Sequence, residues 1–193
     1  MDASHLTQRL AELVPGRSLV LIREAREELT EDELARLSVE QKGVLATLRE
    51  PQRRLEWSEA RRCEWELRAK LGADAKTSIS HTRENGTPVI FAAGAVGVCG
   101  LGIDAELASR TLTEAAALRF IRPEEASLKL DPLHIWVIKE ALFKSNPENA
   151  ETLVPQYRIT AFDQGTGRAQ IGSLEMRFTL SDFSGWVVSL AVC

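Results

Sequence analysis

The sequence predicts an α+β fold in which both halves of the chain pair helices with antiparallel strands. From residue 157 onward, runs of alternating apolar and polar residues are separated by turn residues, a pattern typical of an antiparallel meander. Before this region, amphipathic helical patterns alternate with short apolar runs that predict buried strands. We therefore expect two subdomains, residues 1–99 and 100–193, that pack together.

Local signals place the helices and strands of the first half. Thr30 and Glu33 form a capping box, and Gly43 favours an interruption of the helix that follows. Pro51 and Gly72 occupy the positions that proline and glycine prefer at the start and the end of a helix. The expected helices are residues 6–13, 31–48 and 52–71, and the expected strands are residues 18–22, 78–80, 89–93 and 95–99.

Turn signals organise the strands of residues 78–99. Asn85-Gly86 is a strong turn signal, so we expect the first strand to deliver His81 and Thr82 into a loop. Gly94 separates two apolar runs, and we expect it to join two distinct strands.

Local signals also place the helices and strands of the second half. Thr113 is expected to cap a helix that runs through Phe120, and a short helix should start after Arg122. Asp131 occupies a plausible N-cap position, and Pro132 follows at the first position of an apolar helix. The expected strands of the meander are residues 157–162, 168–171, 174–180 and 186–192.

Composition excludes several classes of protein. The 193 residues carry a net charge of -4, so no basic excess points to nucleic acid. Neither a signal peptide nor an apolar run of membrane-spanning length is present, so we expect a cytoplasmic protein without a membrane partner. Cys63, Cys99 and Cys193 are odd in number and widely spaced, which favours reduced thiols over disulfides or a zinc site.

The stretch 100–106 carries the first candidate functional residues. Apolar and acidic residues alternate there at the period of a strand, which places Asp104 and Glu106 on one face. Two carboxylates in this arrangement are a ready ligand pair for a divalent metal ion.

The apolar helix after Asp131 carries the second set. Glu140 and Lys144 stand one turn apart, Trp136 lies one turn earlier on the same face, and Lys139 is beside them. Charges in a buried helix must be paired, bind a metal or face a ligand, because a lone buried charge costs several kcal/mol. Together with the acidic strand, these residues suggest a magnesium-phosphate site.

These motifs carry a family resemblance. The sequence resembles the signature of the 4'-phosphopantetheinyl transferases of the Sfp type over roughly residues 50 to 145. The matching stretches are Ser78-Ile-Ser-His81-Thr82, Gly102-Ile-Asp104-Ala-Glu106 and Trp136-Val-Ile-Lys139-Glu140-Ala-Leu-Phe-Lys144. The resemblance implies two similar α/β subdomains related by a pseudo-twofold axis, with antiparallel sheets and the site in the cleft between them.

The resemblance also implies an activity. The expected reaction transfers 4'-phosphopantetheine from coenzyme A to a serine of an acyl- or peptidyl-carrier protein and releases adenosine 3',5'-bisphosphate. Asp104, Glu106 and Glu140 would hold Mg²⁺, while Lys139 and Lys144 would contribute positive charge. Glu140 and a metal-bound water stay open as the general base. We expect the protein to act as a monomer.

Coenzyme A contacts follow from the same resemblance. Ser80 and His81 would contact a phosphate, and an arginine of the helix 52–71 would bind another. Arg53, Arg54 and Arg61 are all candidates, and the sequence does not choose among them. For most charges of this helix, the simpler interpretation is a solvated face with internal ion pairs.

One departure from the family motivates an alternative. The family usually carries a G-x-P-containing stretch before the Ser-His pair that helps to hold adenine, whereas here Gly72 is followed almost directly by Lys76 and Ser78. A catalytically impaired homologue that binds a carrier protein or coenzyme A is therefore an alternative. A different magnesium-dependent phosphate enzyme has less support, because no other phosphate-binding motif is present.

Overall fold

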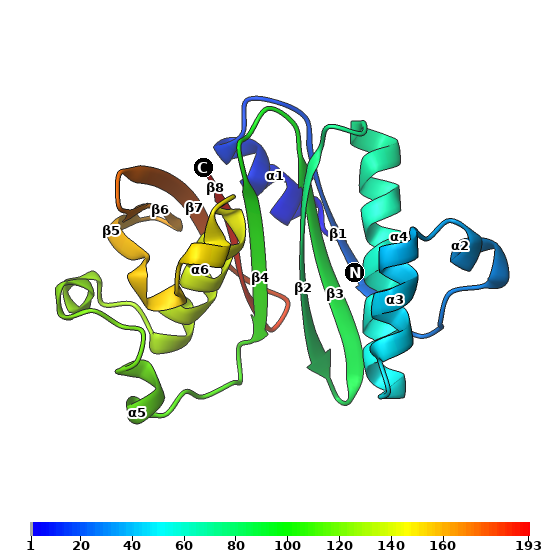
Figure 1. Cartoon of the computed structure of the whole chain (residues 1–193). Helices are drawn as coiled ribbons and strands as arrows, with labels where there is room; N and C mark the ends of the chain where they lie inside the picture. Colours follow the sequence, from blue (N-terminus) through cyan, green and yellow to red (C-terminus); the bar gives the residue numbers. More distant parts are fainter. Residues whose placement is uncertain (1) are drawn as a thin grey trace.

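The computed structural model describes residues 2–193 and contains two antiparallel sheets with helices on them, which confirms the α+β class (Figure 1). The three-stranded sheet has the order β1-β3-β2, with β1 (Ser18–Glu24), β2 (Lys76–Glu84) and β3 (Thr87–Ala95). The five-stranded sheet has the order β4-β8-β7-β6-β5, with β4 (Leu101–Leu107), β5 (Arg158–Asp163), β6 (Thr166–Ile171), β7 (Leu174–Phe183) and β8 (Trp186–Val192). The α-helices are α1 (Ser4–Leu13), α2 (Glu31–Ala35), α3 (Val39–Thr47), α4 (Pro51–Leu71), α5 (Glu114–Ala117) and α6 (Pro132–Ser145). The 3-10 turns are η1 (Pro123–Leu128), η2 (Asn149–Glu151) and η3 (Val154–Gln156).

The two sheets share a topological unit. In each half, a strand is followed by a helix and then by an antiparallel pair, and the last strand lies between the other two. The units are β1-α4-β2-β3 and β4-α6-β7-β8, and β5 and β6 extend the second sheet beyond β7. Each unit packs its helix on its own sheet, α4 on β1 and β3 and α6 on β4 and β8 (Figure 1).

The sheets meet where β2 lies beside β4 (Figure 1). The hydroxyl of Ser78 accepts a hydrogen bond from the backbone N–H of Ile103 at 3.1 Å, and that of Ser80 accepts one from Ala105 at 3.3 Å. Both contacts join residues 25 positions apart, so the two strands run in the same direction. We call this contact between the strands the β2–β4 seam. In the seam, serine hydroxyls accept these hydrogen bonds, whereas backbone carbonyl oxygens accept them between strands of one sheet. The two strands accordingly belong to different sheets.

A shared apolar core lies under α1 and includes residues of both sheets. Leu6 and Leu10 of α1 are fully buried there. Phe91 of β3 and Trp186 of β8 meet edge to face with their ring centroids 5.3 Å apart. Aromatic pairs favour this geometry, and it adds to the apolar burial that holds the sheets together. This shared core therefore fixes the position of one sheet relative to the other.

Helix α4 begins and ends as expected. Pro51 is its first residue, and Gly72 caps its end at a φ of 110° that disfavours other residues. Gly94 does not join two strands as expected, but lies within the single strand β3. The reason is packing, because a Cβ on Gly94 would come within 2.7 Å of Leu71 of α4.

The expected single helix at residues 31–48 is wrong. Two helices form, α2 and α3, and they are separated at residues 36–38 rather than at Gly43. Thr30 caps the first helix, and Ser38 starts the second through its own capping box with Gln41. Gly43 lies inside α3. The capping box at Ser38 therefore determines where the second helix begins, and the single glycine at position 43 does not interrupt it.

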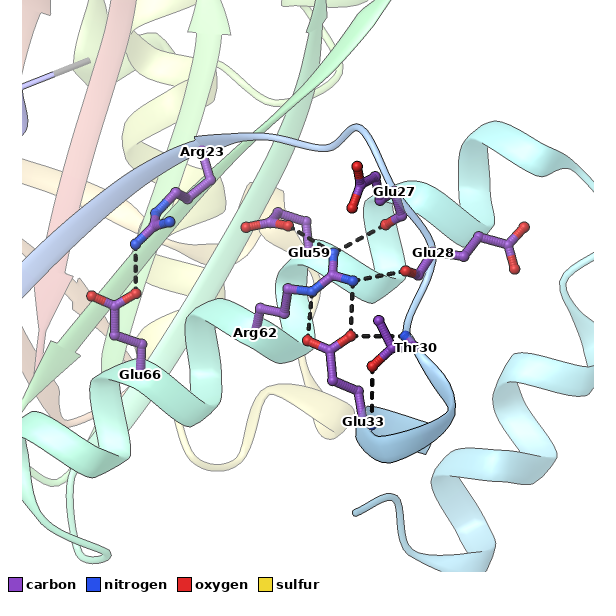
Figure 2. A network of polar contacts seen from close by, with 8 residues as sticks. All are labelled: Arg23, Glu27, Glu28, Thr30, Glu33, Glu59, Arg62 and Glu66. Atoms are coloured by element: carbon purple, nitrogen blue, oxygen red, sulfur yellow. Dashed lines mark hydrogen bonds and ion pairs between the residues drawn. The ribbon is translucent and has the colours of Figure 1, made fainter. Parts of the chain in front are cut away.

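Arg62 of α4 holds α2 and the segment before it in place (Figure 2). The guanidinium of Arg62 bonds to both carboxylate oxygens of Glu33, at 2.8 and 2.9 Å. It also donates to the backbone carbonyls of Glu27 and Glu28, at 3.0 and 2.7 Å. The bonds from Arg62 to the carboxylate of Glu33 lower the pKa of Glu33 to about 2, and burial opposes this shift. The same carboxylate accepts from the backbone of Thr30, so one ion pair fixes both the cap and the connection to α4.

Helix α6 also begins as expected and packs unusually closely on β4. The carboxylate of Asp131 accepts from the backbone N–H of Leu133 at 2.8 Å. A Cβ on Gly102 would overlap the carbonyl oxygen of Ala141, and one on Gly100 would overlap that of Ser145. The two glycines are therefore required for the helix backbone to lie directly against the strand.

The remaining expectations have mixed outcomes. The four-strand meander is confirmed, and so is the turn at Asn85-Gly86, where both residues have positive φ. His81 and Thr82 lie within β2 and not in a loop, because β2 pairs with β3 as far as the turn. The helix expected from Thr113 to Phe120 is only the short α5. Among residues 2–193, no helix combines the length and the apolar character needed to cross a membrane.

Candidate functional site

Asp104 is the centre of the site, at the β2–β4 seam. One of its carboxylate oxygens accepts from the ammonium of Lys144 at 2.7 Å and from the hydroxyl of Ser80 at 2.9 Å. Lys144 also donates to the carbonyl of Ile103 at 3.1 Å. Asp104 is only 6% exposed, so these bonds compensate a substantial desolvation cost. Residues from β2, β4 and α6 therefore converge on one carboxylate.

Glu106 lies on the same face of β4, two residues further along. It forms an ion pair with Arg110, which follows in the loop after the strand. Burial raises the pKa of Glu106, Arg110 opposes this shift, and Asp104 adds to it. The alternation of β4 thus brings the two carboxylates close enough to interact, as the sequence pattern predicted.

Glu140 adds a third carboxylate from α6, one turn before Lys144. Burial raises its pKa, and the negative charges of Asp104 and Glu106 raise it further, while Lys144 opposes them. The three carboxylates therefore interact electrostatically across two elements. This arrangement costs energy in the free protein unless cations lie nearby.

The carboxylates are not arranged as a preformed metal site. Within the described part of the chain, no group of three or more His, Cys, Asp or Glu residues is placed to hold a metal ion. Lys144 and Arg110 instead neutralise Asp104 and Glu106. The donor chemistry still suits Mg²⁺, which prefers carboxylate oxygens and keeps several water ligands. Binding of Mg²⁺ at Asp104, Glu106 and Glu140 stays a prediction, and it requires these lysine and arginine contacts to open.

Lys139 does not lie where the sequence suggested. Its ammonium pairs with Glu125 at 2.7 Å and donates to the carbonyl of Phe120 at 2.7 Å, and both charged side chains are 0% exposed. Burial lowers the pKa of Lys139, and Glu125 opposes this shift. Adjacent residues of a helix point about 100° apart, so Lys139 faces the interior while Glu140 faces the seam. This corrects the expectation that the ammonium of Lys139 lies beside Glu140, and the expected contact with coenzyme A has no support from this position.

A second polar cluster surrounds His81. Its Nε2 lies 2.8 Å from a guanidinium nitrogen of Arg53, and it lies 3.7 Å from the carboxylate of Glu56. Glu56 is 5% exposed and also pairs with Arg53 and Arg83, at 3.0 and 2.9 Å. Burial lowers the pKa of His81, and Glu56 opposes this shift. The imidazole is therefore neutral at pH 7 and accepts the hydrogen bond from Arg53.

The structure distinguishes the three candidate arginines. Arg53 contacts His81, as described above. Arg54 instead bonds to Glu28 and to a backbone carbonyl of α3. Arg61 pairs with Glu64 at 2.6 Å and lies over the ring of Trp57. Only the first of the three therefore shares a cluster with the Ser-His pair.

A small pocket opens beside this cluster. Its volume is about 190 Å³, and its wall is mainly apolar. The lining residues are Leu48, Arg53, Glu56, Trp57, Ala60, Ile79, His81 and Ile90. The volume is below that of a typical pocket for a whole cofactor, and the apolar wall suits one flat ring.

Sequence reasoning missed several residues that shape both clusters. Glu56 and Arg83 could have been found, since Glu56 lies one helical turn after Arg53 and Arg83 lies two residues after His81 on one face of β2. Arg110 carried no comparable signal, because it follows the strand in a loop of no predictable conformation.

Comparison with known proteins adds no independent assignment. No protein-family model matches the chain, and no curated protein matches it either. Any functional conclusion therefore depends on the residues of this chain and their geometry.

Proposed function

We propose that this protein transfers 4'-phosphopantetheine from coenzyme A to a serine of an acyl- or peptidyl-carrier protein. The observation that carries the proposal is the convergence of Ser80, Asp104 and Lys144 on one buried hydrogen-bonded centre. These residues come from three motifs spread over 65 positions of the chain. The contact of three motifs that are distant in the sequence supports a common site for them.

The three carboxylates are the proposed ligands of Mg²⁺. Bound there by Asp104, Glu106 and Glu140, the metal would supply charge neutralisation at the pyrophosphate. The raised pKa values of Glu106 and Glu140 support this assignment, because a divalent cation would relieve the repulsion that contributes to both shifts.

Two positively charged groups are proposed to hold the phosphates. Lys144 is 27% exposed and already lies at the carboxylate centre, so a small movement of its flexible side chain would direct it to a pyrophosphate oxygen. Arg53 and His81 form the second cluster, and Arg53 would bind a further phosphate there. Glu140 is the proposed proton acceptor for the carrier serine when it is not a metal ligand, since its raised pKa improves it as a base.

Two observations favour the alternative of a non-catalytic protein that binds a carrier or coenzyme A. Among residues 2–193, no preformed metal group exists, and the lysine expected beside Glu140 is withdrawn into the interior. A homologue that retained binding but not transfer would tolerate both features.

The test is mass spectrometry of a panel of apo-carrier proteins incubated with the protein, Mg²⁺ and coenzyme A. We expect one phosphopantetheine group per carrier. Asp104→Asn keeps the shape of the side chain and removes its charge, so it should lower the transfer rate by about 100-fold or more. Asp74→Asn, in the exposed loop after α4, is the matched control and should not change the rate.

The two functions give different results in this experiment. If every carrier stays unmodified at saturating coenzyme A while calorimetry detects binding of a carrier or of coenzyme A, the non-catalytic alternative is correct. If Asp104→Asn transfers at the normal rate, the proposed centre is wrong.

A further inference from the structure

Cys99, in the linker between the two sheets, lies beside Cys193, the residue after β8. Cys99 is exposed and lies between β3 and β4, and Cys193 is partly buried and directly follows β8. The backbone N–H of Cys99 donates to the carbonyl of Cys193 at 3.4 Å, and that of Cys193 donates to the carbonyl of Gly100 at 3.3 Å. These bonds continue the β4–β8 ladder, so the two segments already lie side by side.

The side chain of Cys193 lies beside the linker residue Gly100, which directly follows Cys99. The Cys193 thiol donates to the carbonyl of Ser145 at 3.3 Å. A Cβ on Gly100 would come within 2.9 Å of the Cys193 sulfur, so the glycine leaves room for this sulfur beside the linker. Burial raises the pKa of Cys193 to about 12, and the neighbouring Cys99 contributes to the shift.

We propose that Cys99 and Cys193 are a peroxide-sensitive dithiol that closes to an intramolecular disulfide. Exposed Cys99 reacts first, when its sulfur attacks one oxygen of hydrogen peroxide, the O–O bond breaks, and sulfenic acid and water form. The Cys193 sulfur then attacks the Cys99 sulfur, the S–S bond forms, and the hydroxyl leaves as water with the proton of Cys193. In total, two thiols are oxidised and one hydrogen peroxide is reduced to two waters.

The position of the pair gives the disulfide a structural consequence. It joins the linker between the sheets to the end of β8, and it removes the sulfur–hydrogen donor from Ser145. The carbonyl of Ser145 is one of the last of α6 and has no partner within the helix. Oxidation therefore acts on the end of the helix that carries Lys144, one residue away. This inference is independent of the proposed transfer activity.

The test uses the reduced full chain, treated with hydrogen peroxide, blocked with iodoacetamide and digested with trypsin without reduction. Trypsin places Cys99 in the peptide 84–110, Cys193 in 178–193 and Cys63 in 63–68. We expect the first two peptides to appear as one cross-linked species, lighter than their sum by two hydrogen atoms. The mass of the whole chain should be that of a monomer.

Single variants supply the controls. In Cys193→Ser the second step is blocked, so dimedone should trap sulfenic acid at Cys99 several-fold more than in the wild type. Cys63→Ser should keep the cross-link, because Cys63 is 1% exposed and burial raises its pKa to about 12. The proposal is wrong if peroxide converts Cys99 to sulfinic acid without a cross-link, or if the cross-link joins two molecules.

Discussion

At the scale of single residues, Ser80 connects the architecture to the candidate site. Its hydroxyl accepts from the backbone of Ala105 across the β2–β4 seam and donates to the carboxylate of Asp104. Ser78, two residues earlier, makes the same kind of backbone contact, with Ile103, but is not bonded to Asp104. The two serines thus form a natural pair for separating the structural role from the positioning role.

Ser80→Ala and Ser78→Ala should both lower stability, Ser80→Ala somewhat more because Asp104 also loses a hydrogen bond, but the two should differ clearly in activity. Each leaves one buried backbone N–H without its acceptor, at a cost of about 1–3 kcal/mol in the free energy of unfolding. Only Ser80→Ala should also lower magnesium-dependent transfer, by about 10-fold or more, because the orientation of a proposed ligand is lost. Urea denaturation and the carrier assay measure the two effects. Equal activity of the two variants would show that Ser80 does not position Asp104.

The raised pKa of Glu140 makes a second prediction, for the metal-free protein. The folded state holds this proton at a higher pH than the unfolded chain does, so it binds more protons in the window above the ordinary value of 4.5. The free energy of unfolding should then increase as the pH falls from 7 through the raised pKa. Glu140→Gln should be more stable than the wild type at pH 7 and should lose this part of the pH dependence.

Denaturation at several pH values in the presence of EDTA measures this effect. Glu175→Gln, at an exposed position of β7, is the control and should retain the wild-type pH dependence. If Glu140→Gln is less stable than the wild type at pH 7, the carboxylate is stabilised rather than repelled by its surroundings.

At the scale of elements, the buried pair of Glu125 and Lys139 determines how α6 is attached. Glu125 of η1 also accepts from the backbone of Arg122 and of Ile159 in β5, at 2.9 and 2.8 Å. One carboxylate therefore joins α6 to the segment before it and to the edge strand after it. Both charged groups are hydrogen-bonded to each other and to backbone groups, which compensates the cost of burying them.

Lys139→Met should mainly lower stability, whereas Lys144→Met should mainly weaken coenzyme A binding. Lys139→Met leaves Glu125 charged and buried, and should lower the free energy of unfolding by about 3–5 kcal/mol with little change in coenzyme A affinity of the folded protein. Lys144→Met should cost less stability, since Lys144 is 27% exposed, but should weaken coenzyme A binding. Thermal unfolding and calorimetry measure the two properties. Weak binding by a stable Lys139→Met variant would restore the coenzyme A role to Lys139.

At the scale of the whole molecule, two packed sheets and one seam hold the carboxylates together. The shared core under α1 fixes the sheets, and Gly100 and Gly102 let α6 lie close enough to β4 for Lys144 to reach Asp104. The site is therefore a product of close packing between backbones, and it should be sensitive to small changes of volume far from any charged group.

Gly102→Ala and Gly43→Ala test this sensitivity. A methyl group at Gly102 would overlap the backbone of α6 and should destabilise the protein by about 1–3 kcal/mol or more. Gly43 has open space around its Cβ position within α3, so the same change there should stabilise the helix by about 0.5–1 kcal/mol. Urea denaturation measures both. A neutral effect at Gly102 would mean that α6 moves away from β4 at low cost.

Local signals in the sequence determined most of the elements and part of the site. Caps, turns and alternation act within a few residues, so the start of α6 at Asp131 and the turn at Asn85-Gly86 could be predicted. For the same reason, the spacing of Asp104 and Glu106 on β4 and of Glu140 and Lys144 on α6 could be found without a structure.

Only the tertiary structure decided which of these groups meet. Gly94 continues β3 because Leu71 packs against it, and Lys139 turns inward because Glu125 lies there, from elements that no local pattern brings together. The bond of Ser80 to Asp104 and the pairing of Glu106 with Arg110 arise in the same way. Long-range packing and the need to pair buried charges select these partners, and both depend on the complete fold.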